Sequence, residues 1–416
     1  MSQVTKHHRV LIAGGGAAGI TVAARLKRKG PADLDIAIIE PSDAHYYQPA
    51  FTLVGAGSYT LDATRKAEAK LIPPGVKYIR GQVKEFDPAN NRVKLAGGTT
   101  ITYDYLVVAT GVKLDWSKIE GLRETLGRNG VCSNYSPDYV NYTWECVRNL
   151  KAGAKTVFTQ APLPFKCPGA PQKAAYLTAD HMSRNGLRES CDVQFFTHAP
   201  VIFGVPFFAR ELVKVAARHK IGVNYQHNLV AVDGPGKTAT FERVSDAAKG
   251  ERVTVPFDLL HVSPAQSPHD EVRSSALANA AGWVEVDQAT LQHVKFPNVF
   301  SLGDVCSTPN SKTAAAVRKQ APVVVRNLLH MMAKEAAEKG YDGYASCPLT
   351  TAYGKVIMAE FTYGGKVTPT LPLDPAKESA INWQIKTTGL PILYWNYMLK
   401  GHEWFPKHNT AFVEPK

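Results

Sequence analysis

A glycine-rich turn near the start of the chain is the feature that most restricts its fold. Residues 10–13 (VLIA) are apolar, residues 14–19 (GGGAAG) follow at once, and residues 20–26 (ITVAARL) have helical periodicity. This order predicts a buried strand, a tight turn and a helix whose first N–H groups point at an anion, typically a pyrophosphate. The residues expected to contact that anion are Gly14, Gly16, Ala17 and Gly19.

The next apolar stretch supplies a second part of the same predicted site. Residues 36–39 (IAII) indicate a neighbouring strand, and Glu40 follows them about 20 residues beyond the last glycine of the turn. A carboxylate at that distance accepts hydrogen bonds from the hydroxyl groups of a ribose. The turn and Glu40 together therefore predict a Rossmann-like unit that binds a dinucleotide, rather than a plain glycine turn.

Two later segments indicate which dinucleotide is bound. Residues 103–111 (YDYLVVATG) and 298–304 (NVFSLGD) each predict a buried strand that ends in a turn of small residues. They resemble the ATG and GD signatures of flavoproteins with two dinucleotide-binding domains. The resemblance implies an α/β fold of two Rossmann-like domains, as in glutathione reductase, with FAD in the first. The residues that it assigns to FAD are Thr110, Gly111, Gly303 and Asp304, the last on the ribitol chain.

The middle of the chain lacks a second phosphate-binding turn. Residues 155–160 (KTVFTQ) predict a strand where flavoproteins of this architecture begin an NAD(P)H-binding unit. The loop that follows, residues 161–173 (APLPFKCPGAPQK), carries four prolines and a cysteine instead of three glycines. Proline has no N–H to offer a phosphate, and its fixed φ prevents the tight turn. We therefore expect no nicotinamide binding at this loop.

The six cysteines are too few for a disulfide scaffold in 416 residues, and none forms a C-x-x-C pair, so we expect no metal site. Three are expected to be inert core residues, as buried cysteines usually are: Cys132, Cys146 and Cys191. The role of Cys306 stays open. Cys167 and Cys347 are each followed by proline and lie 180 positions apart, and we expect them to converge on one face of the flavin.

The cysteine loop and the end of the chain resemble those of sulfide:quinone oxidoreductases, and the resemblance covers essentially the whole chain. The segments that carry it are 45–49 (HYYQP), 167–173 (CPGAPQK), 347–348 (CP) and the tail around Lys386 and residues 393–396 (LYWN). It implies that Gln48 and Lys386 belong to the FAD site. No cysteine or histidine stands out as a covalent anchor for the flavin, so we expect FAD to be held noncovalently. Some bacterial members have a third active-site cysteine earlier in the chain, but Cys132 lacks a matching context.

The same resemblance implies a two-cysteine reaction with hydrogen sulfide. Hydrosulfide attacks a Cys167–Cys347 disulfide, because a disulfide is the natural electrophile for a soft anionic nucleophile. We assign the resulting persulfide to Cys347 and the attack on the flavin to Cys167. The sulfane sulfur passes to a small acceptor such as glutathione or sulfite, and the electrons pass from FAD to a quinone. Lys173 either provides positive potential at the thiols or is a solvated helix residue.

The C-terminal tail suggests where the quinone is reduced. Residues 389–400 (GLPILYWNYMLK) form an apolar stretch of about a dozen residues, too short to span a bilayer but suited to a helix in its surface, with aromatic rings at headgroup depth. We expect ubiquinone or menaquinone to enter there, past Phe361, Tyr394 and Trp395. A helix packed on the protein's own core or on a second copy is the alternative. The expected location is peripheral, on the cytoplasmic face of a bacterial inner membrane or the matrix face of the mitochondrial one.

The expected organisation has three parts. They are an FAD-binding domain of residues 1–112 and 285–345, a second Rossmann-like domain of residues 113–284 without a working nicotinamide loop, and a quinone and membrane region of residues 346–416. The net charge of +12 favours anionic partners, but no nucleic-acid-binding module is present. Two alternative functions remain: a non-pumping NADH:quinone oxidoreductase, which needs the missing glycine loop, and a flavin-containing redox sensor without turnover.

Overall fold

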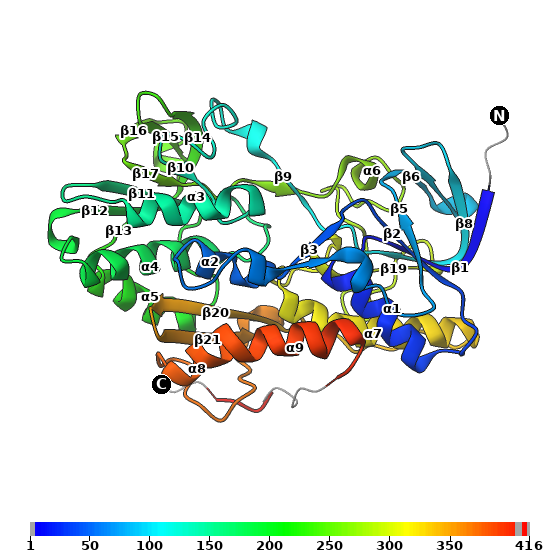
Figure 1. The fold of residues 1–416 in the computed structure, drawn as a ribbon. Helices are drawn as coiled ribbons and strands as arrows, with labels where there is room; N and C mark the ends of the chain where they lie inside the picture. Colours follow the sequence, from blue (N-terminus) through cyan, green and yellow to red (C-terminus); the bar gives the residue numbers. More distant parts are fainter. Residues whose placement is uncertain (1–4, 404–409, 414–416) are drawn as a thin grey trace.

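Two mainly parallel sheets form the framework of the structure, a computed structural model that describes residues 5–403 and 410–413 (Figure 1). The first sheet has seven strands in the order β5-β2-β1-β8-β7-β6, with β19 also paired with β8. Their bounds are β1 Thr5–Ala13, β2 Ile36–Glu40, β5 Lys77–Arg80, β6 Val83–Asp87, β7 Arg92–Leu95, β8 Thr100–Val108 and β19 Val299–Ser301. The four strands predicted from apolar runs are β1, β2, β8 and β19.

These four strands are adjacent and parallel. Val10 of β1 pairs with Ile36 of β2, and Leu106 of β8 pairs with Val299 of β19. Their carboxyl ends therefore lie along one edge of the sheet, and each strand runs directly into a segment that the sequence assigns to FAD. The fold thereby brings together the turns that follow these four strands, although the strands are spread from residue 5 to residue 301.

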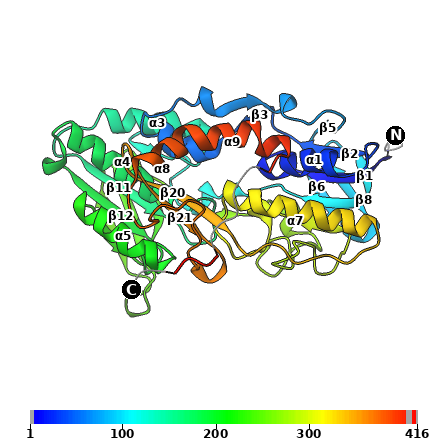
Figure 2. The ribbon, with the colours of Figure 1, turned by 90° about the horizontal axis from the view of Figure 1, so that it is seen from below.

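Two long helices lie side by side against the first sheet (Figure 2). They are α1, Ala17–Lys29, and α7, Ala314–Met332, and each buries an apolar face. Helix α7 ends at Met332, and Lys334, two residues further on, takes a left-handed conformation with a φ of 62°.

The second sheet has five parallel strands in the order β10-β17-β11-β12-β13. Their bounds are β10 Val131–Cys132, β11 Lys155–Gln160, β12 Asp192–Thr197, β13 Gly222–Tyr225 and β17 Leu259–His261. The connecting helices are α3 Pro137–Arg148, α4 Ala170–Arg184 and α5 Pro206–Arg218, and the antiparallel strands β14 His227–Asp233, β15 Thr238–Arg243 and β16 Arg252–Pro256 follow. The alternation of strand and helix makes this unit Rossmann-like, as expected.

Several short elements connect these units. They are β3 Ala44–Tyr46, β4 Arg65–Ala67, β9 Lys113–Leu114, β18 Gln266–Ser267, α2 Phe51–Val54 and α6 Asp270–Arg273. Strand β9 pairs with β18 where the chain first leaves and later returns to the half that contains the first sheet.

The C-terminal part crosses both halves of the molecule. It comprises the hairpin β20 Ala345–Ala352 and β21 Lys355–Phe361, then α8 Ala380–Gln384, a π-helical turn Ile385–Gly389 and α9 Leu390–Asn396. Helix α8 contacts β21, while the residues after α9 contact α1 at the other end (Figures 1 and 2). Within the described ranges, no helix is long and apolar enough to cross a bilayer.

The expectation that aromatic rings of the tail lie at headgroup depth is wrong for Tyr394 and Trp395. Both side chains are buried, because this side of α9 covers the first domain. The Tyr394 hydroxyl is 2.6 Å from Nε2 of His45, and the Trp395 ring meets the His45 ring edge-on. Other apolar residues of the helical segment face outward instead: Ile381 is 60% exposed and Ile392 is 48% exposed.

Candidate active site

The glycine turn after β1 is packed so closely that two of its glycines are sterically required. A Cβ on Gly19 would lie 1.9 Å from the carbonyl oxygen of Gly14, and Gly14 has a φ of +107°. A Cβ on Gly16 would meet nothing within 4 Å. No described side chain caps the start of α1, so the N–H groups after Gly16 and the partly exposed Ala17 are available to a pyrophosphate.

Glu40, at the end of β2, is held beside this turn by two backbone N–H groups. Gly15 donates to Oε2 and Ser42 donates to Oε1, each at 2.8 Å. Burial raises the pKa of Glu40, and these two hydrogen bonds act against the rise. The carboxylate is therefore fixed in position to accept hydrogen bonds from ribose hydroxyls.

The turns after β8 and β19 form the rest of the carboxyl edge of the first sheet. Thr110 Oγ1 is buried and has no hydrogen-bond partner among the described residues. Gly111, at a φ of +68°, has open space where a Cβ would stand, and Gly303, at a φ of +76°, brings Asp304 to the same edge. An unpartnered hydroxyl, a carboxylate and open glycine positions fit FAD bound along the carboxyl ends of these strands.

Cys167 and Cys347 come together although 180 residues separate them. Cys167 lies between β11 and α4 at a φ of 51°, and its N–H donates to the carbonyl of Lys312 at 2.9 Å. Cys347 lies in β20, opposite Ala359 of β21. The Lys173 ammonium is 3.2 Å from Sγ of Cys167 and 3.8 Å from Sγ of Cys347, and both thiols are free.

The two thiols have opposite tendencies to ionise. The pKa of Cys167 is lowered well below its usual range, first by the hydrogen bond from Cys347 and then by the charges of Lys173 and Lys386. The same hydrogen bond, together with burial, raises the pKa of Cys347 well above its usual range. Of the two, Cys167 is therefore the more acidic thiol. Burial and, next, the charge of Lys173 lower the pKa of Lys386 to about 7.

The start of α4 faces these thiols. A Cβ on Gly169, the residue before α4, would lie 2.6 Å from Sγ of Cys347, so only glycine permits this approach. Lys173 lies in the first turn of α4 and is 2% exposed. Of the two roles expected for it, this burial favours a positive charge beside the thiols and excludes a solvated helix residue. The partial positive charge of a helix N-terminus adds to that of the lysine in favouring a thiolate.

Three further residues of the site were not identified from the sequence. Burial lowers the pKa of Lys166 and of Lys312, and both lysines lie near Asp304, whose own pKa is raised by burial. The Tyr135 hydroxyl donates to the carbonyl of Cys167 at 3.2 Å. Lys166 could have been identified from the sequence, because it directly precedes Cys167. Lys312 and Tyr135 are distant in sequence, and no local pattern marks them.

Gln48 and Lys386 reach the site from opposite ends of the chain. Lys166 Nζ donates to Oε1 of Gln48 at 2.8 Å. Lys386 is buried, and its Nζ is 3.5 Å from the carbonyl oxygen of Pro49. It lies in the π-helical turn Ile385–Gly389, a distortion common at functional sites. The segment around Gln48 and the C-terminal tail thus meet beside the cysteine loop.

The three aromatic residues predicted to line a quinone pocket lie in two separate cores. Phe361 packs edge-on against Phe203 at a ring distance of 6.0 Å, in the core of the second domain and the hairpin. Tyr394 and Trp395 pack with Tyr47 in the core of the first sheet. The cores formed by the described residues do not bring Phe361 together with the other two.

The remaining four cysteines make other contacts. The thiol of Cys191 donates to the carbonyl of Lys151 at 3.3 Å, and that of Cys306 donates to the carbonyl of Gly303 at 3.2 Å. Cys132 and Cys146 are hydrogen-bonded to each other, a pairing that the sequence did not indicate.

The sequence as a whole is similar to known proteins. The family model described as pyridine nucleotide-disulphide oxidoreductase matches residues 8–136. The chain is 43% identical to the mitochondrial sulfide:quinone oxidoreductase of Dictyostelium discoideum, over 99% of this chain and 89% of that protein. It is 42% identical to the mitochondrial sulfide:quinone oxidoreductase of Mus musculus, over 95% of this chain and 87% of that protein.

A solved structure gives the same fold. The sulfide:quinone oxidoreductase from Aquifex aeolicus superposes with a TM-score of 0.80 at 22% identity, over 95% of this chain and 92% of that one. The predicted α/β fold with two Rossmann-like units is confirmed. At 42–43% identity over nearly its whole length, the chain belongs to the sulfide:quinone oxidoreductase family.

Proposed function

We propose that the chain oxidises hydrogen sulfide at Cys167 and Cys347, with noncovalently held FAD as the first electron acceptor and ubiquinone or menaquinone as the final one. The observation that carries this proposal is the contact of both thiols with the ammonium group of Lys173. A buried cation beside two cysteines stabilises a thiolate and attracts the hydrosulfide anion.

The unequal pKa values assign a direction to the reaction. In the oxidised enzyme an S–S bond joins Cys167 and Cys347. Hydrosulfide attacks Sγ of Cys347, the S–S bond breaks, and its electron pair leaves on Sγ of Cys167, because the thiol of lower pKa is the better leaving group. A persulfide remains on Cys347, and Lys173 and Lys386 stabilise the Cys167 thiolate.

The persulfide then gives its outer sulfur to a small nucleophile such as glutathione or sulfite. Hydrogen sulfide has then lost two electrons, and both cysteines are left reduced. FAD, bound along the edge from Gly16 to Asp304, supplies the two-electron acceptor that allows the disulfide to form again. Lys386 is suited to hold or release a proton beside the Cys167 thiolate, since its pKa is about 7.

The outward face of the α8 to α9 segment is the proposed contact with the membrane. Ile381 and Ile392 expose apolar side chains there, and Lys400 follows at the end of the segment. Apolar residues flanked by lysines suit a helix that lies in the surface of an anionic bilayer. Lys386 lies on the inner side of the same segment, where its charge acts on the Cys167 thiol. The protein would sit peripherally, on the matrix or the cytoplasmic face.

Stopped-flow mixing of sulfide with the FAD-loaded protein tests the proposed chemistry. Cys167→Ser and Cys347→Ser should each slow flavin reduction by roughly 10³-fold or more while FAD content stays unchanged, because the thiols act as one unit. Cys191→Ser is the matched control and should react at the parental rate, since its thiol donates to the backbone carbonyl of Lys151 and lies 4.0 Å from the Ser190 hydroxyl, not beside Lys173.

Three results would contradict the proposal. Parental rates in both active-site variants would exclude the persulfide route. Flavin reduction by NADH as fast as by sulfide would favour a non-pumping NADH:quinone oxidoreductase. Reduction by sulfide with no subsequent turnover of any quinone would favour a redox sensor.

A further inference from the structure

The second Rossmann-like unit holds two cysteines that take no part in the proposed sulfide reaction. Cys132 ends β10, Cys146 lies in the last turn of α3, and both belong to the core of this unit. Only residues 133–136 separate the strand from the helix, so α3 folds back onto β10 and the two sulfur atoms come within hydrogen-bond distance. Both thiols are free, so this contact is that of a reduced dithiol.

Two hydrogen bonds converge on the sulfur atom of Cys146. Tyr142 and Cys146 are four residues apart and therefore lie on the same face of α3. The Tyr142 hydroxyl accepts from the backbone N–H of Gly130 at 3.0 Å and donates to the sulfur of Cys146. The thiol of Cys132 is the second donor to that sulfur. Both hydrogen bonds favour a negative charge on Cys146.

The two thiols differ in access and in acidity. Cys146 is partly exposed on α3, whereas Cys132 is 0% exposed. The pKa of Cys146 is lowered by the hydrogen bonds from Cys132 and Tyr142, against the effects of burial and of the charge of Glu145. Burial, and then the hydrogen bond to Cys146, raises the pKa of Cys132 well above its usual range. An accessible, acidic thiol beside a buried one is typical of an attacking cysteine and its resolving partner.

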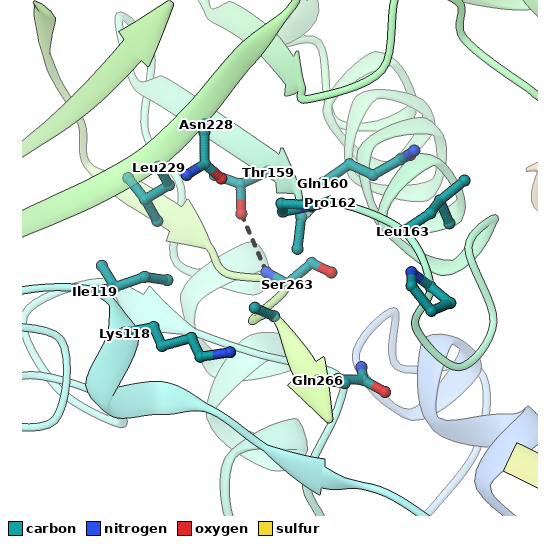
Figure 3. Close-up of a pocket in the computed structure, with 13 residues that line it drawn as sticks. Lys118, Ile119, Thr159, Gln160, Pro162, Leu163, Asn228, Leu229, Ser263 and Gln266 are labelled. Carbon is teal, nitrogen blue, oxygen red and sulfur yellow. Dashed lines mark hydrogen bonds between the residues drawn. The ribbon is translucent and has the colours of Figure 1, made fainter. Parts of the chain in front are cut away.

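The cavity at the carboxyl edge of the second sheet is a separate feature. It has a volume of about 510 Å³, and in its wall the backbone N–H of Ser263 donates to the hydroxyl oxygen of Thr159 at 3.0 Å (Figure 3). None of the 13 residues that line it is a cysteine. Because Cys146 has exposed surface of its own, a reagent reaches it from the outer side of α3 rather than through this cavity.

We propose that Cys132 and Cys146 form a second dithiol, which a small molecule with an S–S bond, such as glutathione disulfide or a polysulfide, oxidises to a disulfide. The Cys146 thiolate attacks one sulfur of the small molecule, whose S–S bond breaks, and the other sulfur leaves as a thiolate. Cys132 then gives its proton to that thiolate and attacks Sγ of Cys146, and the remaining part of the small molecule leaves as a second thiolate. The two cysteines lose two electrons, and the small molecule gains them.

Mass spectrometry of the FAD-loaded protein after incubation with glutathione disulfide tests the site. In the parent we expect a peptide in which Cys132 is linked to Cys146. In Cys132→Ser the reaction should stop after its first step and leave glutathione on Cys146. In Cys146→Ser the buried Cys132 should stay unmodified. Cys191, whose thiol donates to the carbonyl of Lys151, is the internal control and should stay reduced throughout.

Inorganic polysulfide is the second probe and should give the same linked peptide in the parent. A link that only one of the two probes produces identifies which kind of S–S bond oxidises the pair. The proposal fails if neither probe produces the link, or if glutathione adds to Cys132 in Cys146→Ser as fast as it adds to Cys146 in Cys132→Ser. None of these measurements requires sulfide turnover, so their results are independent of the proposed enzymatic activity.

A tyrosine substitution tests the role of the hydrogen bond to Cys146. Burial raises the pKa of Tyr142 to about 12, so its hydroxyl keeps its proton at neutral pH and acts as a donor. Tyr142→Phe, made together with Cys132→Ser, should therefore slow the addition of glutathione to Cys146 several-fold at neutral pH. Tyr139→Phe, on the same helix, is the control and should leave the rate unchanged. Equal rates in the two tyrosine variants would refute the acidification of Cys146 by Tyr142.

Discussion

Replacing Lys173 with methionine should raise the pKa of Cys167. The ammonium lies 3.2 Å from Sγ of Cys167. At an effective dielectric constant of about 20, two unit charges at this separation attract each other by roughly 5 kcal/mol. Losing this attraction raises the pKa of Cys167. The energy is the upper limit for the variant, because a second lysine responds to the change.

Lys386 offsets part of the loss. Its pKa is about 7 because of burial first and the charge of Lys173 second, so removing Lys173 lets Lys386 hold its proton at neutral pH. The protonated Lys386 then stabilises the thiolate, so we expect the pKa of Cys167 to rise by less than the loss of Lys173 alone would give. The thiolate of Cys167 exists above its pKa and disappears as pH falls through it. In Lys173→Met the disappearance therefore begins at a higher pH than in the parent.

The pH dependence of Cys167 alkylation by iodoacetamide, followed by mass spectrometry on the reduced protein, measures this shift. Lys214→Met is the control, since Lys214 is exposed on α5 and pairs with Glu211 at 2.8 Å. An unchanged midpoint in Lys173→Met would refute the electrostatic argument and assign the low pKa of Cys167 to the hydrogen bond from Cys347 alone.

Three other substitutions test separate parts of the structure. Gly19→Ala places a Cβ 1.9 Å from the carbonyl oxygen of Gly14 and should weaken FAD binding in a fluorescence titration; an unchanged affinity would mean that the turn moves freely. Tyr394→Phe removes the hydrogen bond to His45 and should lower the unfolding free energy by about 1 kcal/mol in calorimetry, whereas a parental value would show that this bond contributes nothing. Ile392→Asp should reduce liposome flotation with no loss of FAD, and full flotation would remove this face from the membrane contact.

The FAD edge could be predicted from the sequence because its signals are local. Each part is a short apolar strand followed by a turn of small residues or by Glu40, and such patterns need only adjacent positions. The parallel pairing of β1, β2, β8 and β19 then brings the parts together without further information. The steric need for glycine at Gly19 is likewise local, since its Cβ would meet the carbonyl oxygen of Gly14, whereas the close contact at Gly14 is with the backbone of Ala109, at the end of β8.

The buried face of the tail could not be predicted in the same way. Residues 389–400 are apolar on nearly every side of a helix, so their periodicity does not select the face that packs inward. The choice depends on His45, which meets Tyr394 and Trp395 from the other end of the chain. Lys312 escaped prediction for a similar reason, since only the folded chain brings its carbonyl to the N–H of Cys167.

In the second Rossmann-like unit, the start of a helix stabilises negative charge on a cysteine sulfur instead of on a phosphate. In this type of fold, a strand, a glycine turn and a helix N-terminus hold a phosphate. Here nine residues, 161–169, separate the end of β11 from the start of α4, and the helix N-terminus reaches the thiols through Gly169. Lys173, one turn further on, adds a full charge at 3.2 Å from Cys167. The proline-rich loop therefore positions Cys167 where the helix N-terminus stabilises negative charge. A short glycine turn in its place would have no residue at that position to hold the cysteine.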